Sequence, residues 1–369
     1  MIGISLELGI VLAGLMAGRI LFRRDPKVPD QILSGVLPEV SIIIPARNEA
    51  ANLPLLLGDL ATQTHRPLEV LVVDDDSEDE TAAIAGSFPV RVLELKDKPR
   101  GWLGKTWACY RGARQARGAW LLFLDADVRL APDALGRLLS TAGATSRAVT
   151  VQPYHLAKLP HEQLAMVFNL LQVGSTGAAM ARPRNLGMFG PLILIPAADY
   201  WKAGGHGAVR ASIVEDVALG LALKEAGVAY GMYRGDPSIA FRMYAEGIQA
   251  LIQGWTKNLA AGAARMPLAL FFLVFLWISS MTSVAVQVIR YGILGQYVLM
   301  VVYGFLYALW VAFLLVWGRR LGSFKLWTIL IYPMSLVLFI AVFFRSTLKK
   351  LLGMDVVWKG RRIDPRGSS

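Results

Sequence analysis

The strongest chemical signal in the sequence is a pair of aspartates, Asp125 and Asp127, separated by a single residue. They follow directly after the apolar run 120–124, which is typical of a buried strand. Two carboxylates in this position can share a hard cation with phosphate oxygens, because Mg²⁺ prefers one or two carboxylates together with substrate phosphates and waters. An Asp-x-Asp pair alone is more often a solvated turn, so the preceding strand is what favours a metal site here.

A second acidic cluster, residues 74–80, follows the apolar run 70–73. Asp75, which follows the predicted strand, could accept the imide or amino proton of a nucleobase. Asp79 and Glu80 are expected only to stabilise the start of a helix, where negative side chains are favourable. The competing interpretation is that the whole cluster is a solvated turn that opens a helix.

A basic loop lies between these two clusters. Lys96, Lys98 and Arg100 lead into residues 101–106, which read Gly-Trp-Leu-Gly-Lys-Thr. A flexible basic loop that faces an acidic rim is suited to hold a diphosphate. Its spacing differs from the Gly-x-x-x-x-Gly-Lys of a P-loop, so an ATPase is not supported. We predict that Lys105 contacts a phosphate or a base.

Further polar residues fall in the later part of the chain. Asp216, next to Glu215, could take the proton of an acceptor hydroxyl as a general base, although the pair could equally cap a helix. Arg242 and Trp255 lie just before a long apolar segment, where tryptophan and basic residues are often simple membrane anchors. We expect His206, Glu215, Arg242 and Trp255 at the acceptor side of the site.

The elements that must position these residues follow an alternating pattern. Short apolar, β-branched runs at 40–44, 70–73 and 120–124 are typical of buried parallel strands, and residues 49–63 form a helical stretch between the first two. Strands that alternate with helices predict an α/β doubly wound sheet with ligands at the carboxyl ends of its strands. The polar clusters that follow the three runs would therefore meet at one rim.

The composition is that of a membrane protein, with 55% hydrophobic and 18% charged residues. The net charge of +11 could indicate nucleic acid. However, Arg23, Arg319 and Lys349, each beside a second basic residue, flank apolar runs, which fits anionic lipid headgroups better. We expect a lipid bilayer as partner and no nucleic acid. The single cysteine, Cys109, excludes an intrachain disulfide and is interpreted as a small buried apolar residue.

Four apolar segments are long enough to cross a bilayer. Residues 3–22 form an N-terminal anchor, and the basic residues after it place the following chain in the cytoplasm. The other three segments are residues 267–289, 294–316 and 325–346. Three full crossings would put the basic tail outside, against the positive-inside rule. We therefore expect one segment to be re-entrant or interfacial and the tail to be cytoplasmic.

One more stretch, residues 162–180, is apolar on one face and lacks strong charge. It fits an interfacial helix beside the site or an ordinary core helix. Taken together, these patterns divide the chain into an N-terminal transmembrane anchor, a linker, a cytoplasmic catalytic domain, transmembrane helices and a basic tail, at residues 1–24, 25–39, 40–258, 259–348 and 349–369. This organisation predicts a multi-pass protein of the cell (plasma) membrane.

The order of the polar motifs resembles a known family. Residues 41–49, 73–77, 125–127 and 215–216 look like the successive motifs of family-2 glycosyltransferases of GT-A fold. The resemblance implies an inverting transferase that uses a UDP-sugar with Mg²⁺ or Mn²⁺. It also implies roles by motif position: nucleotide contacts from Pro45, Arg47, Glu49 and Asp75, diphosphate and metal binding by Asp125 and Asp127, and general-base catalysis by Asp216.

A narrower resemblance is carried by segments outside these motifs, residues 101–105, 189–191, 204–206, 241–244, 254–257 and 358–361. They look like the carotenoid glycosyltransferases of the staphyloxanthin pathway, which attach glucose from UDP-glucose to the carboxylate of diaponeurosporenoate. The resemblance implies a lipophilic acceptor in the membrane. Processive polysaccharide synthases instead carry a Gln-x-x-Arg-Trp motif, of which residues 251–255 keep only the Trp, so a single transfer is favoured.

Several alternatives stay open. Another lipid, such as a glycolipid, a hopanoid or a polyprenyl phosphate, could be the acceptor. A sugar nucleotidyltransferase would need a Gly-rich triphosphate loop after the first strand, and residues 45–49 do not form one. A transporter would carry ionisable residues inside its membrane segments, and those after Pro267 have almost none. A catalytically dead scaffold is disfavoured because every expected carboxylate is retained.

Overall fold

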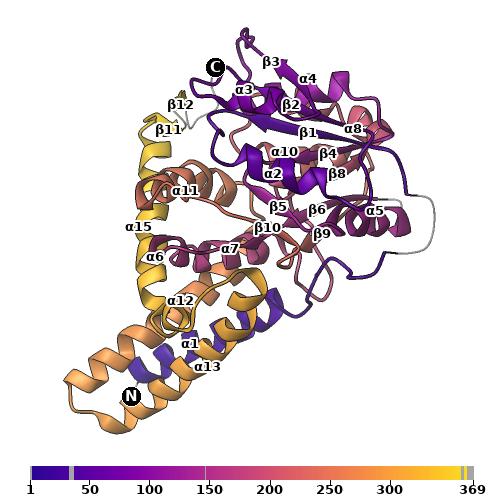
Figure 1. The fold of residues 1–369 in the computed structure, drawn as a ribbon. Coiled ribbons are helices and arrows are strands. Elements are labelled where there is room, and N and C mark those ends of the chain that lie inside the picture. The colour runs from indigo at the N-terminus through magenta and orange to yellow at the C-terminus, as the bar shows by residue number, and fades with distance from the viewer. Residues whose placement is uncertain (1, 33–36, 146, 359–360, 364–369) are drawn as a thin grey trace.

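Seven strands form one mixed sheet (Figure 1). Their order is β3 (Arg91–Glu94), β2 (Glu69–Asp74), β1 (Val40–Ala46), β4 (Trp120–Leu124), β8 (Leu192–Pro196), β6 (Ala148–Gln152) and β9 (Tyr230–Arg234). The computed structural model describes residues 2–32, 37–145, 147–358 and 361–363. β1 lies between β2 and β4 and is parallel to both, so the three strands expected from the apolar runs are confirmed as parallel neighbours.

Helices cover both faces of this sheet because its central strands are apolar on both sides. The helices are α2 (Leu53–Ala61), α3 (Thr81–Gly86), α4 (Gly104–Gln115), α5 (Ala134–Thr145) and α10 (Glu215–Glu225). Ile42 and Ile44 point to the face covered by α2 and α5, and Ile43 points to the face covered by α4 and α10. α4 approaches β1 so closely that a Cβ on Gly112 would lie 2.5 Å from Cγ2 of Ile43. Cys109 is buried on the same helix, as expected.

A small second sheet supports the rim where the site residues meet. It has the order β5 (Val128–Leu130), β10 (Ile239–Phe241) and β7 (Tyr154–His155). β5 begins directly after Asp127 and pairs antiparallel with β10. The backbone N–H of Arg242 donates to the carbonyl oxygen of Asp127 at 3.1 Å. This pairing fixes the strand end of the Asp-x-Asp segment against the segment that carries Arg242.

The remaining helices of the domain are α6 (Pro160–Gln163), α7 (Met166–Thr176), α8 (Ala197–Lys202), α9 (Gly205–Ala208) and α11 (Ile248–Ala263). α6 and α7 account for the apolar stretch 162–180. Most of α7 is buried, and Phe168 and Leu170 have no exposed surface. α7 lies between the sheet domain and the apolar C-terminal helices (Figure 1). The core-helix interpretation therefore holds, and the interfacial one is wrong.

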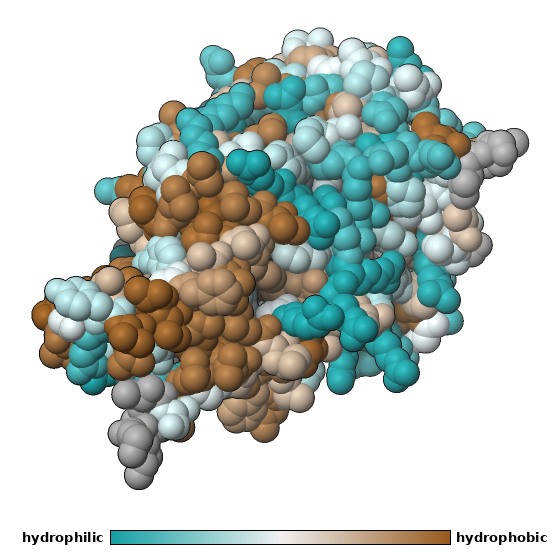
Figure 2. Space-filling model, turned by 90° about the horizontal axis from the view of Figure 1, so that it is seen from below, coloured by the Kyte–Doolittle hydropathy of each residue, from teal (hydrophilic) through white to brown (hydrophobic). Residues whose placement is uncertain are grey.

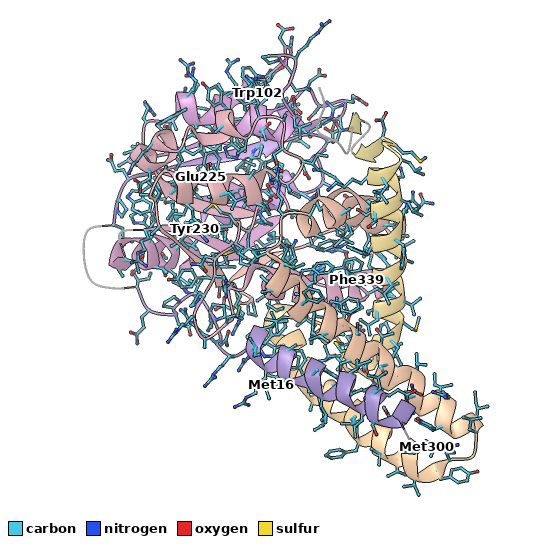
Figure 3. The ribbon with its side chains drawn as sticks, turned by 180° about the vertical axis from the view of Figure 1, so that it is seen from behind. Met16, Trp102, Glu225, Tyr230, Met300 and Phe339 are labelled. Carbon is cyan, nitrogen blue, oxygen red and sulfur yellow. The ribbon has the colours of Figure 1, made fainter. Side chains whose placement is uncertain are left out.

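Three long helices project from the domain as a bundle (Figure 1). They are α1 (Ile2–Leu21), α12 (Leu268–Ile293) and α13 (Tyr297–Leu321). Within the described ranges, α12 and α13 are the two helices that are long and apolar enough to cross a membrane. Ser280 of α12 donates a hydrogen bond to the carbonyl of Val11 at 3.0 Å, and this contact ties α1 to α12. In Figure 3, Met16 and Met300 lie on this bundle, at the opposite end of the molecule from Trp102.

The third predicted crossing is not a single straight helix. It is divided at Ile331 into α14 (Leu326–Leu330) and α15 (Tyr332–Leu351). α15 leaves the bundle and runs along the domain, where it packs on α11 (Figure 1). Phe339 of α15 contacts Phe168 of α7, with ring centroids 5.5 Å apart (Figure 3). The chain then ends its described part in the hairpin β11 (Val356–Trp358) and β12 (Arg361–Ile363), with β11 beside α11.

The path of α15 along the domain resolves the conflict between the number of apolar segments and the position of the basic tail. α12 and α13 form a hairpin that returns to the domain, and the segment with Lys349 and Lys350 stays on the domain side. The expectation that one of the three C-terminal apolar segments does not cross agrees with this course, because α15 packs along the domain and, among the described helices after α11, α12 and α13 are the candidate spans. Hydropathy alone does not distinguish a helix that crosses a bilayer from one that packs along a domain.

Ion pairs attach the linker and the bundle to the domain. Asp25, just beyond α1, pairs with Arg234 on β9 and lies 3.5 Å from Arg320 at the end of α13. Arg137 of α5, which is 2% exposed, donates to Asp236 at 2.8 Å and to the carbonyl of Pro29 at 2.9 Å. Burial would raise the pKa of Asp236, but Arg137, the backbone N–H of Ser238 and Lys27 together outweigh it, and the pKa falls to about 2.

We expect Arg137→Met to lower the free energy of unfolding by about 3 kcal/mol at neutral pH, because one partner of a buried ion pair is lost while Lys27 stays near Asp236. The pKa of Asp236 is lower in the folded protein than its ordinary value of 3.8, so the pair stabilises the fold above about pH 4. The difference from wild type should shrink as the pH falls toward 2. Urea unfolding of the detergent-purified protein measures both effects. Arg114→Met, at an exposed position on α4, is the control, and an equal loss there would contradict the account.

Candidate active site

A cavity of about 330 Å³ opens at the carboxyl ends of β1, β2 and β4. It is closed on the other side by the start of α10, the segment after β10 and the helix α11. All but one of the site residues predicted from the sequence line this cavity. They are Pro45, Arg47, Glu49, Asp75, Lys105, Asp125, Asp127, Glu215, Asp216, Arg242 and Trp255. The predicted convergence at one rim is therefore what the structure has.

The exception is His206, which is buried beneath the site. Its Nδ1 is 3.0 Å from the hydroxyl of Tyr200, and its ring packs against Phe123 with centroids 4.9 Å apart. Burial lowers the pKa of His206 to about 4, so the ring is neutral. The structure thus gives His206 a packing role behind β4 and does not bring it to the acceptor side of the cavity.

At one end of the cavity, the loop after β1 is fastened to the loop after β2. Arg47 donates to the carbonyl of Asp75 at 2.9 Å and pairs with Glu78 at 2.8 Å. Asn48, with a φ of 52°, receives a bond from the backbone of Glu78 and donates its own N–H to Ser77. The guanidinium of Arg47 thus holds the two loops together while its side chain lines the cavity.

The acidic cluster 74–80 divides into structural and cavity-facing members. Asp74 accepts a hydrogen bond from the backbone of Ser77 at 3.1 Å, which shapes the turn. Asp79 accepts from the backbone of Thr81 at 3.0 Å at the start of α3, as predicted. Asp75 is 5% exposed and lines the cavity. The different positions predicted for Asp75 and Asp79 are therefore those that the structure has, since only Asp75 directly follows the strand.

Asp125 and Asp127 both line the cavity. The backbone N–H of Asp125 donates to the carbonyl of Pro191 at 3.0 Å, and Asp127 is held by the pairing with Arg242 described above. In the described part of the chain, no group of three or more His, Cys, Asp or Glu side chains could hold a metal by itself. Two carboxylates beside a basic loop fit a Mg²⁺ or Mn²⁺ ion that takes its other ligands from a diphosphate and water.

Lys105 lies between Asp125, one of the two carboxylates that could hold a metal ion, and Glu215 at the start of α10. Its Nζ is 2.7 Å from Oδ1 of Asp125 and 3.3 Å from Oε1 of Glu215. Burial alone would lower the pKa of Lys105, but Asp125 and Glu215 outweigh it and raise the pKa well above its ordinary value. A permanently charged ammonium group beside Asp125 is suited to contact a phosphate.

Glu215 and Asp216 open α10, and the N-cap is Val214, so neither is itself the capping residue. Burial raises the pKa of Asp216 and the nearby charge of Glu215 raises it further, to about 6. The backbone N–H of Gly190, at 3.0 Å, offsets part of this effect. Burial would also raise the pKa of Glu215, but Lys105 and Lys257 outweigh it and lower that pKa. Adjacent carboxyls with pKa values pushed apart can take different roles in proton transfer.

α11 supplies the wall nearest the bundle. Trp255 is 3% exposed and stacks on Phe168 at 4.7 Å, and its indole nitrogen has no hydrogen-bond partner among the described residues. Gly254 lets Tyr244 lie against the helix, since a Cβ there would be 2.5 Å from Cε1 of Tyr244. Arg242 donates to the fully buried Glu162 at 2.9 Å, so its charge is balanced within the wall.

Lys257 and Gln172 also line the cavity, and sequence reasoning missed both. Lys257 lies just before the long apolar segment, where basic residues are often membrane anchors, so its sequence position did not point to the cavity. Burial lowers the pKa of Lys257, while Glu215 and Asp216 act against this change.

Comparison with known proteins places these features in context. Residues 41–183 match the model of the family described as Glycosyl transferase family 2. The 4,4'-diaponeurosporenoate glycosyltransferase of Staphylococcus aureus strain MRSA252 is 32% identical over 364 residues, which covers 96% of each chain. The protein of the same description from strain N315 is 32% identical over 361 residues, with the same coverage. Among solved structures, a mannosyltransferase from Pyrobaculum calidifontis in complex with GDP-Man and Mn²⁺ has a TM-score of 0.55 at 17% identity. The match covers 94% of this chain and 96% of the mannosyltransferase chain, so the two proteins share the fold.

The raised pKa of Asp216 can be measured directly. We expect infrared difference spectra of the protein to show a protonated carboxyl band that titrates near pH 6 and is absent from Asp216→Asn. In Glu215→Gln the midpoint should fall, because a neighbouring negative charge is removed, but it should stay above the ordinary value because burial remains. A midpoint near pH 4 in the wild type would contradict the burial and charge arguments.

Proposed function

The chain belongs to glycosyl transferase family 2, and we propose that it transfers glucose from UDP-glucose to the carboxylate of a membrane-bound carotenoid acid. The single observation that carries this proposal is the placement of the cavity. One wall holds the Asp125–Asp127 pair, and the opposite wall is α11, which leads directly into α12. The relatives described above act, by their name, on diaponeurosporenoate, which is such an acid.

The donor would lie across the loops after β1, β2 and β4. Pro45, Arg47, Glu49 and Asp75 surround the space in which the uracil and ribose would bind. Asp125 and Asp127 would hold Mg²⁺ or Mn²⁺ together with the diphosphate. The bound cation would supply Lewis-acid stabilisation of the departing diphosphate. Lys105, at 2.7 Å from Asp125, would add a second positive charge beside the same leaving group.

The acceptor would enter between α11 and the segment after β10. Tyr244, Met243 and Trp255 give this side apolar walls, and Lys257 gives it a positive charge. One carboxylate oxygen of the acceptor would attack the anomeric carbon as the bond to the diphosphate breaks, which releases UDP and inverts the anomeric configuration. Because a carboxylate is already ionised at neutral pH, Asp216 has little proton to remove and would orient the acceptor.

The bundle would place this site at the surface of the cell membrane. α12 and α13 carry exposed apolar side chains along their length, among them Leu268, Phe275, Ile293, Val298 and Phe305. Seen from below, apolar residues form a broad continuous surface beside a hydrophilic one (Figure 2). Basic residues at the domain end of the bundle favour a cytoplasmic catalytic domain. α15, whose outer face exposes Val337, Phe344 and Leu351, would lie at the membrane surface.

The proposal is tested with membranes that contain the protein, UDP-glucose and a carotenoid acid, with UDP release and product mass as readouts. We expect glucosylated acid that disappears on addition of EDTA and falls at least about 100-fold in Asp127→Asn, because the leaving diphosphate loses several kcal/mol of stabilisation. Glu225→Gln, at the exposed far end of α10, should retain wild-type activity. Sugar on a different lipid would overturn the carotenoid acceptor, and no UDP release from any UDP-sugar would overturn the donor.

Asp216→Asn separates the two possible roles of this residue. With an alcohol acceptor the variant should lose about 10²–10⁴-fold in kcat, the usual contribution of a general base. With the carotenoid acid the loss should be much smaller, because no proton has to be removed and the introduced amide can donate a hydrogen bond to the acceptor carboxylate. Parallel assays with the acid and the corresponding carotenoid alcohol measure the difference. Equal losses on both acceptors would show that Asp216 acts as a base in either case.

Lys257→Met tests whether α11 recognises the acceptor charge. We expect KM for the carotenoid acid to rise roughly 10–100-fold, the effect of one charge-assisted hydrogen bond, with KM for UDP-glucose unchanged. KM for the alcohol acceptor should stay within about twofold, because no charge is recognised there. Lys202→Met, on the exposed surface of α8, is the matched control. Equal KM changes for acid and alcohol would assign Lys257 a structural role only.

A further inference from the structure

A second cavity of about 480 Å³ lies outside the catalytic site, between α1 and α13. Its floor is aromatic, with Phe22, Trp310, Phe313 and Trp317, and Arg19 and Arg23 stand at its rim. The volume falls in the range of small-molecule sites in proteins, about 300–1,000 Å³. Neither the sequence motifs nor the proposed transfer reaction uses this groove.

The floor of the groove is built from closely packed rings. The ring of Phe22 lies 5.3 Å from that of Phe313 and 5.0 Å from that of Trp317. α1 can approach α13 because Gly18 has no side chain; a Cβ there would be 3.2 Å from Cη2 of Trp310. The result is a fixed apolar surface, which suits a hydrocarbon chain better than water.

The rim carries two positive charges. Arg19 lies in the last turn of α1 and Arg23 lies two residues beyond its end, and both line the cavity. Both are exposed, and within the described residues neither forms an ion pair with a carboxylate. Arg320, in contrast, is paired with Asp25. The two arginines therefore attract an anion to the mouth of an apolar groove.

The groove lies at the domain end of the bundle. Along it α1 and α13 run in the same direction, since Leu15 and Trp310 line one part while Phe22 and Trp317 are in contact farther along. Both helices end there beside the domain, at the Asp25 ion pairs. If the bundle spans the membrane, this end is at the headgroup level of the leaflet next to the domain. Basic pockets between helices at that level bind anionic lipid headgroups.

We propose that this groove binds one anionic phospholipid. Its phosphate would be held by the guanidinium groups of Arg19 and Arg23, which bind phosphate oxygens in a bidentate manner. An acyl chain would lie on the aromatic floor formed by Phe22, Phe313 and Trp310. The lipid would bridge α1 and α13 beside their attachment to the domain. The proposal depends on insertion of the bundle into a bilayer and not on the sugar-transfer reaction.

Native mass spectrometry of the full-length, delipidated protein in detergent tests the proposal, with phosphatidylglycerol and phosphatidylcholine as probes. We expect the wild type to retain phosphatidylglycerol preferentially. The double variant Arg19→Gln/Arg23→Gln should bind it about 30-fold more weakly, from about 1 kcal/mol for each basic residue near an anionic lipid. Phosphatidylglycerol should also raise the melting temperature of the wild type and not of the double variant. If the double variant does not purify, each single variant should show about a fivefold loss.

Arg24→Gln is the matched control, because Arg24 is exposed next to Arg23 but does not line the groove. It should retain wild-type binding. An equal loss of phosphatidylglycerol binding in Arg24→Gln would show that the lipid is attracted by basic residues in general and would overturn the proposal. Equal retention of the two lipids by the wild type would overturn it as well. Displacement of phosphatidylglycerol by a carotenoid acid would overturn the assignment to phospholipid and make the groove an acceptor site.

Discussion

The ammonium group of Lys105 lies between the carboxylates of Asp125 and Glu215, at 2.7 and 3.3 Å. These residues come from the start of α4, the end of β4 and the start of α10, so one cation joins three elements of the sheet domain. Without it, carboxylates buried so close together would repel and take up protons. Because Lys105 keeps Glu215 ionised, Glu215 in turn raises the pKa of Asp216. The charge state of the acceptor side therefore depends on a residue at the donor side.

A charged site that serves an apolar acceptor also needs a fixed relation to the membrane. α11 connects the site with the apolar helices. Its residues Trp255 and Lys257 line the cavity, and its end leads into α12. The Asp25 pairs with Arg234 and Arg320 join the ends of α1 and α13 to the same domain. α15 packs on α11 from the outer side. The bundle and the wall formed by α11 are thereby joined to the same domain through direct contacts.

The sequence was most informative where function follows from local order. The three apolar runs predicted β1, β2 and β4, and the residues directly after them predicted the rim, because parallel strands end at one edge. Contacts between distant segments could not be predicted: neither the attachment of Arg47 to the second loop nor the burial of His206 behind β4 has a local signature. The same holds for Lys257, whose helix must first fold over the sheet. Hydropathy found the apolar segment 325–346 but not the break at Ile331 that directs α15 along the domain.

The central claim is that donor and acceptor meet in one cavity and react in a single displacement. Only one face of the sugar is then open to attack, opposite the diphosphate held beside Asp125 and Asp127. UDP-glucose carries an α-linked sugar, so the anomeric configuration of the product is the most direct test. Proton NMR of the glucosylated acceptor should show the large coupling constant of a β-linked anomeric proton. An α-linked product would contradict the single displacement and require either a covalent intermediate or attack from the face of the leaving group.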